Sequence, residues 1–115
     1  MYDVGYKKGI KMLEKDIINF LQSLLRKIIK IELMISQSPP KHIPSYQKLL
    51  GLQQKMETLP LEKRGFFFKE LIKVRGAITY FLNGRYDDGM NSLIEVKKKV
   101  IKLLLKNERN KNKKL

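Results

Sequence analysis

The chain of 115 residues contains 25 Lys plus Arg against 11 Asp plus Glu, giving a formal net charge of +14, and 43% of its residues are hydrophobic. This length fits a single domain, and the hydrophobic content suffices for a core without metal ions or disulfides. Because the chain has no cysteine, disulfides and thiolate metal sites are excluded.

The N-terminal residues lack the basic region, apolar run and small-residue cleavage site of a secretory signal, so an intracellular protein is expected. The longest charge-free apolar stretch of the first half, residues 17–25, is much shorter than the roughly 20 residues that cross a bilayer. No transmembrane segment is therefore predicted.

Hydrophobic residues recur at helical spacing along the chain, which predicts an all-α protein. The first helix is predicted over residues 4–35, with Asp3 as its N-cap. Its core-facing residues follow at steps of three or four and are Tyr6, Ile10, Leu13, Ile17, Leu21, Leu24, Ile28, Ile31 and Ile35. A second apolar set is expected to be buried on another side of the later turns: Ile18, Leu25, Ile29 and Leu33.

Three prolines interrupt the pattern between residues 36 and 44, which predicts a connector there. A second helix is predicted from Ser45 as N-cap, and a third with Pro60 in its first turn. The expected core residues of these two helices are Leu49, Leu52, Met56, Leu59, Phe67, Leu71, Val74, Ile78 and Phe81.

The third helix is expected to end at Asn83-Gly84, which is typical of a left-handed C-cap. Gly65 and Gly76 inside it indicate close approach of another helix. The triplet Phe66-Phe67-Phe68 points around the helix. We expect the ring that falls off the main apolar stripe to be buried in the core from a second side, rather than exposed as an anchor for a partner.

A fourth helix is predicted after Asp88, with Leu93, Val96, Val100 and Leu103 in the core. The predicted fold is a four-helix, mainly antiparallel bundle over residues 1–106, followed by a flexible, disordered basic tail over residues 107–115. The first helix would be about 48 Å long at 1.5 Å per residue. Because it would project beyond shorter helices, self-association or membership of a larger complex is expected.

Two segments resemble known helical families. The run Ala77-Ile78-Thr79-Tyr80-Phe81-Leu82-Asn83-Gly84-Arg85-Tyr86-Asp87-Asp88-Gly89 resembles the helical hairpin of a tetratricopeptide unit, with Gly89 where that pattern has Ala. It occurs once, so the resemblance implies a helical hairpin and no particular ligand. Residues 24–29 with Leu59-Pro60-Leu61-Glu62 are similar to the helical domain of GINS replication subunits, without the small β domain of that family. Neither resemblance assigns the chain to a family.

Positive charge is concentrated at the C-terminus, where nine Lys and Arg residues from Lys97 onward accompany one acid, Glu108, and carry +8 of the +14. A second basic ridge is predicted opposite the core side of the first helix. The predicted nucleic-acid-binding residues are Lys8, Lys11, Lys15, Arg26, Lys30, Lys97, Lys98, Lys99, Lys102, Lys106, Arg109, Lys111, Lys113 and Lys114.

No pattern of catalytic residues is apparent. His42 is the only histidine, so neither a catalytic triad nor a multi-histidine metal site can be built within one chain. It is expected to be a solvent-exposed loop residue. Asp87 and Asp88 follow a turn, which favours helix capping over cation binding. The protein is therefore predicted not to be an enzyme, with no cofactor, no metal and no small-molecule substrate.

The leading hypothesis is a DNA- or RNA-binding protein that contacts the phosphate backbone. Only five of the 25 cations are Arg, the side chain suited to paired hydrogen bonds with bases, so little sequence specificity is expected. The alternative is a helical adaptor or assembly subunit that works through protein–protein contacts. A solubilising surface and attachment to an anionic membrane also remain open.

Overall fold

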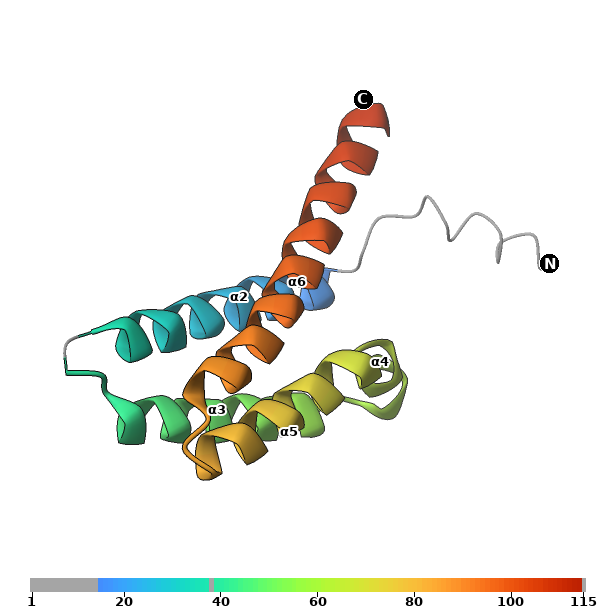
Figure 1. The fold of residues 1–115 in the computed structure, drawn as a ribbon. Helices are drawn as coiled ribbons and strands as arrows, with labels where there is room; N and C mark the ends of the chain where they lie inside the picture. The colour runs from blue at the N-terminus through green and yellow to red at the C-terminus, as the bar shows by residue number, and fades with distance from the viewer. Residues whose placement is uncertain (1–14, 38, 115) are drawn as a thin grey trace.

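The computed structural model describes residues 15–37 and 39–114 (Figure 1). Their helices are α2 (Lys15–Ser36), α3 (His42–Glu57), α4 (Leu61–Phe66), α5 (Phe68–Leu82) and α6 (Tyr86–Lys114). These ranges contain no strand, so the all-α prediction is confirmed. The predicted bundle of four helices is not confirmed, because five helices occupy the described ranges. The predicted helical positions 4–14 lie outside them.

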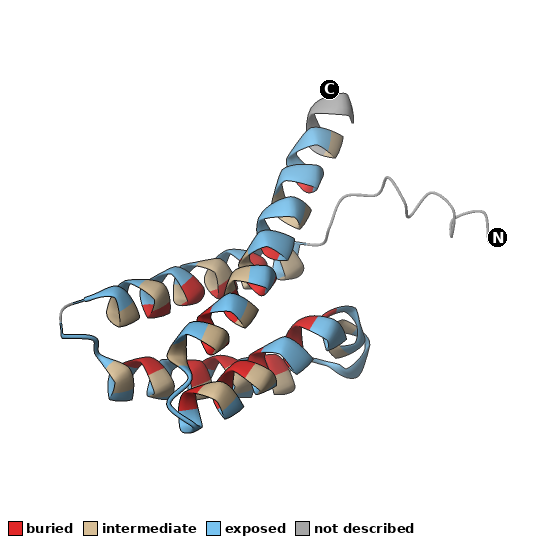
Figure 2. Ribbon diagram, in the orientation of Figure 1, coloured by how far each residue is buried: buried red, intermediate tan, exposed pale blue. Residues whose placement is uncertain are grey.

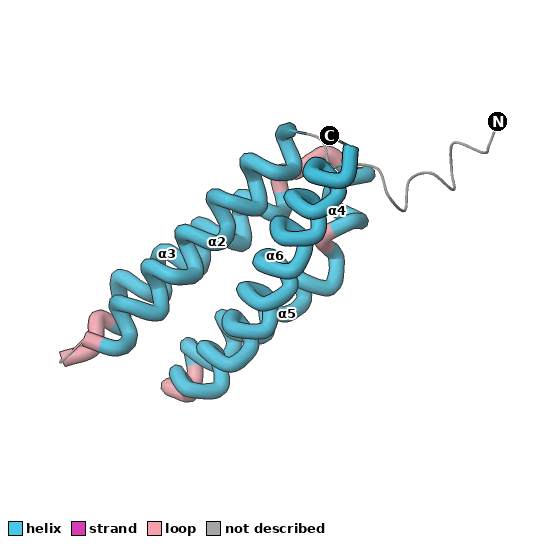
Figure 3. The backbone as a smooth tube through the Cα atoms, turned by 90° about the horizontal axis from the view of Figure 1, so that it is seen from above, coloured by secondary structure: helices cyan, strands magenta, loops and turns pink. Residues whose placement is uncertain are grey.

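Four of the helices pack side by side. α2 contacts α3 and α6, α5 contacts the same two helices, and the short α4 contacts α5. Figure 3 shows α2 beside α3 and α6 beside α5. The described part is elongated, measuring 53 × 28 × 19 Å along its principal axes.

The core lies where these four helices meet, and buried positions line their inward sides (Figure 2). Most predicted core positions are confirmed as buried: Leu21, Leu24, Ile28, Ile31, Leu49, Leu52, Met56, Phe67, Leu71, Val74, Ile78, Phe81, Leu93, Val96 and Val100. The predicted burial of Ile29 and Leu33 is wrong, because these side chains are 41% and 59% exposed. They line two hollows at the surface of α2.

The start of α3 differs from the prediction. The helix begins at His42, and Ser45 is inside it rather than at the N-cap. The Ser45 hydroxyl donates a hydrogen bond to the Lys41 carbonyl, with an O···O distance of 2.6 Å. Pro44 is tolerated in the first turn because amides there have no partner within the helix.

A break at Phe67 divides the predicted third helix into α4 and α5. Pro60 is the N-cap of α4 rather than a first-turn residue, and Phe67 joins the two helices with φ −103° and ψ 17°. The break directs the Phe67 ring into the core, 5.1 Å from the Phe20 ring centroid. Phe66 and Phe68 are 46% and 56% exposed, so the core interpretation of the triplet is correct for Phe67 alone.

The turn between α5 and α6 has the left-handed C-cap predicted at Gly84, whose φ is 75°. The Gly84 amide donates to the Phe81 carbonyl and the Arg85 amide to the Tyr80 carbonyl, at N···O distances of 3.1 and 2.8 Å. This pair of bonds is the Schellman motif. The helical hairpin implied by the tetratricopeptide resemblance is confirmed.

Close approach between α5 and α6 occurs at Gly89. A Cβ atom there would lie 2.5 Å from the Phe81 ring and 3.2 Å from the Ala77 carbonyl oxygen. The prediction of close approach at Gly65 and Gly76 is wrong, because an added Cβ at either residue would have no neighbour within 4 Å.

α6 is longer than predicted, and it is the helix that projects beyond the others (Figure 1). The predicted helix end at Lys106 and disordered tail from Asn107 are wrong for residues 107–114, which continue the helix to Lys114. Extending a formed helix adds one hydrogen bond per residue, and Lys and Arg have good helix propensity. The polar composition of residues 107–114 therefore does not end the helix.

Candidate polyanion-binding surfaces

One side of α6 carries a row of cations, called here the α6 basic face: Lys98, Lys99, Lys102, Lys106 and Arg109. All five are exposed, whereas Leu93, Val96 and Val100 of the same helix are buried. Steps of three and four residues keep these cations on the side away from the core. Lys111, Lys113 and Lys114 belong to the last turns of α6, whose backbone alone is described.

Acidic side chains leave the α6 basic face largely unneutralised. Within residues 15–37 and 39–114, no ion pair joins an acid to any of its five cations. Glu95 lies near its start, where the Lys73 ammonium binds it at 2.7 Å. The hydrogen bond from Lys73, then its charge, and more weakly the charge of Lys98 lower the pKa of Glu95.

Lys97 differs from the other predicted residues of α6. Its ammonium donates to Glu32 of α2 with an N···O distance of 2.7 Å, and both side chains are about a quarter exposed. Lys97 therefore holds α6 against α2, and the structure does not add it to the α6 basic face.

The predicted ridge of the first helix is partly described. Lys15, Arg26 and Lys30 are exposed on α2, and Lys8 and Lys11 lie outside the described residues. The structure does not bring this ridge and the α6 basic face together. Ile29 and Leu33 line one hollow with Arg26 and Lys30 and a second hollow with residues of α6. The α6 residues of the second hollow are Asp87, Met90, Ile94 and Lys97, none of which belongs to the α6 basic face.

Sequence reasoning predicted Arg26 and Lys30 as binding residues but missed the group that they form with two further cations between α2 and α3. Arg26, Lys27, Lys30 and Lys48, with Ser23, line a hollow of about 230 Å³. Burial, followed by the charges of Lys55, Lys48 and Arg26, lowers the pKa of the Lys27 ammonium. The seven-residue spacing of Lys48 and Lys55 places both on one side of α3. Only the packing of α3 on α2 brings that side to Lys27, so the sequence pattern alone could not have found the group.

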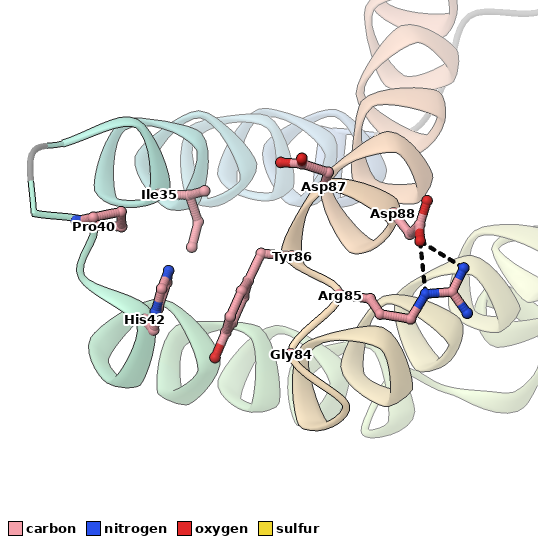
Figure 4. Close-up of a pocket in the computed structure, with 8 residues that line it drawn as sticks. All are labelled: Ile35, Pro40, His42, Gly84, Arg85, Tyr86, Asp87 and Asp88. Carbon is pink, nitrogen blue, oxygen red and sulfur yellow. Dashed lines mark hydrogen bonds and ion pairs between the residues drawn. The ribbon is translucent and has the colours of Figure 1, made fainter.

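The prediction that His42 is an exposed loop residue is wrong. It lies half-buried in the first turn of α3, and its ring stacks on Tyr86 with centroids 3.8 Å apart and planes 6° apart. Figure 4 shows the surrounding pocket of about 370 Å³, where Arg85 binds Asp88 and the carboxylates of Asp87 and Asp88 point in different directions. Both acids are in the first turn of α6, where they complement the helix dipole.

Across the described ranges, no three or more His, Cys, Asp or Glu side chains are grouped as metal ligands. No helix of these ranges combines the length and apolar content needed to cross a bilayer. No protein family, curated protein or solved structure was found to match the chain. The function is therefore inferred from the geometry and charge of the surfaces described above.

Proposed function

We propose that this protein binds the phosphate backbone of nucleic acids through the α6 basic face, with little dependence on base sequence. The observation that carries the proposal is the row of five exposed cations on one side of α6, none of them in an ion pair with an acid of the described residues. The cations of such a row displace the counterions condensed on the phosphate backbone, and the release of these counterions favours binding at low salt. Four of the five are lysines, which contact phosphate as point charges.

The projection of α6 supports the same function. Its C-terminal turns extend beyond the other helices (Figure 1), so a nucleic acid strand can approach that end without meeting α3 or α5. Lysines four residues apart on a helix lie about 6 Å apart along its axis. Adjacent phosphates of a strand are separated by a similar distance, so successive lysines can contact successive phosphates.

Fluorescence anisotropy with labelled duplex DNA, single-stranded DNA and RNA tests this proposal. The variant Lys102→Gln/Lys106→Gln removes two cations from the α6 basic face, and we expect its affinity at about 0.1 M salt to fall at least tenfold, because two phosphate contacts are lost. The matched control is Lys41→Gln/Lys69→Gln, which removes two exposed cations elsewhere. Equal losses in the two variants, or no binding at low salt, would contradict the proposal.

A second candidate function is assembly with a protein partner, which the exposed Ile29 and Leu33 favour. These two side chains and Met34 form the apolar part of a hollow of about 520 Å³, whose rim includes Arg26, Lys30 and Lys41. Apolar residues rimmed by cations fit an amphipathic helix with acidic flanks. An acidic amphipathic peptide that binds the parent chain but not Leu33→Asp, together with no nucleic acid binding, would favour this role.

A further inference from the structure

The cations between α2 and α3 form a compact group on different helices, called here the α2–α3 basic cluster: Arg26, Lys27, Lys30, Lys48 and Lys55. Four of them line one hollow together with Ser23, and all five of these side chains carry hydrogen-bond donors. Lys27 is half-buried within the group, whereas the other four are exposed. The cluster is therefore more concave than the α6 basic face.

Acids that could neutralise this cluster are held elsewhere. Glu57 is the acid closest in sequence to Lys55, but it accepts hydrogen bonds from Arg75 and Gln53. Asp16 binds Lys63, and Glu32 binds Lys97. No acidic side chain lines the hollow, and the described residues pair none of the five cations with an acid.

Like charges held together destabilise a fold unless an anion compensates them. The lowered pKa of Lys27 reflects this cost, since burial and three neighbouring cations disfavour its charged form. A bound anion with several charges would relieve the repulsion. The hollow, at about 230 Å³, is smaller than the roughly 300–1,000 Å³ of pockets that enclose drug-sized ligands. It suits phosphate groups rather than a whole nucleotide.

We infer that the α2–α3 basic cluster is a binding site for two or three linked phosphate groups, separate from the α6 basic face. The phosphates come either from a free polyphosphate or from the backbone of a nucleic acid strand, since both present the same chemistry to the cluster. The site does not depend on the α6 contact, because the residues that line its hollow belong to α2 and α3.

Isothermal titration calorimetry of the full chain with inorganic tripolyphosphate, and separately with a short DNA single strand, tests the inference. We compare Lys27→Gln/Lys48→Gln with Lys102→Gln/Lys106→Gln, which removes the same charge from α6. The cluster variant is expected to lower the affinity for at least one ligand tenfold or more, while the α6 variant changes that ligand's affinity less. The ligand that responds identifies the source of the phosphates.

A second variant distinguishes a lost phosphate contact from misfolding of the protein. Lys48→Gln/Lys55→Gln changes only exposed side chains, and it should also lower the affinity. In thermal melts without ligand, Lys27→Gln should raise the melting temperature, because it removes like-charge repulsion. The inference is overturned if tripolyphosphate and the strand bind the cluster variants as tightly as the parent chain, or if the cluster and α6 variants lose affinity equally. A failure of nucleic acid binding through α6 would leave this comparison unaffected.

Discussion

Glu57 shows how single acids of this basic chain are committed to particular cations. The Arg75 guanidinium donates to its carboxylate with N···O distances of 2.6 and 3.2 Å, and Gln53 donates a third bond at 3.2 Å. Chiefly through the Arg75 hydrogen bond, the pKa of Glu57 is lowered from its ordinary value of 4.5. The contact links α3 to α5.

The stability that Glu57 provides is therefore expected to disappear in acid. Because its pKa is lower in the folded protein, the contribution is complete above about pH 4.5 and is lost as the pH falls through the folded-state pKa. Glu57→Gln should melt at a lower temperature than the parent chain at pH 7, and the difference should shrink by pH 3. Thermal melts across this range, with Glu108→Gln as control, measure the effect. An unchanged difference between pH 7 and pH 3 would refute this role.

At the scale of single residues, the three- and four-residue spacing of apolar side chains predicted the main core-facing side of α2 and α5. It did not predict that Ile29 and Leu33 of α2 are exposed. It could not predict that Lys97 binds Glu32, or that Lys27 lies near Lys48 and Lys55. Those contacts join residues on different helices. They depend on how the helices are rotated and offset against each other, which the periodicity of one helix does not contain.

At the scale of elements, the contact of α5 with α6 depends on the absence of a side chain at Gly89. Gly89→Ala should destabilise the protein by about 1–3 kcal/mol, because its methyl group would overlap the buried Phe81 ring. Gly76→Ala is the matched control in α5. Its methyl group would meet nothing within 4 Å, so a stabilisation of about 0.5–1 kcal/mol is expected from the better helix propensity of Ala. Urea unfolding measures both, and equal effects would contradict the assigned packing.

Some helix boundaries can be predicted from the local sequence, and others cannot. Gly84 was predictable as a helix end because its left-handed conformation has a residue preference of its own. The break at Phe67 carries no such signal, since its position follows from burying the Phe67 ring beside Phe20. Two predictions from local residue preferences were wrong for similar reasons. Ser45 was predicted as an N-cap, but tertiary packing places it inside α3. Lys106 was predicted as a helix end, but helix propagation continues α6 beyond it.

For the whole molecule, the distribution of charge matters more than its total of +14. Five ion pairs of the described residues tie acids to Lys63, Lys73, Arg75, Arg85 and Lys97. Among the remaining cations of the described residues, two groups stand out, one on α6 and one between α2 and α3. The sequence predicted the first group from its C-terminal run of lysines. The second required the packing of α3 on α2.

The salt dependence of duplex DNA binding tests the central claim most directly. If Lys102 and Lys106 each neutralise a phosphate, the slope of log K against log salt should be less steep by about 1.8 in Lys102→Gln/Lys106→Gln, at about 0.9 per contact. The control Lys41→Gln/Lys69→Gln should keep the slope of the parent chain. An identical slope in all three proteins would contradict phosphate binding by the α6 basic face.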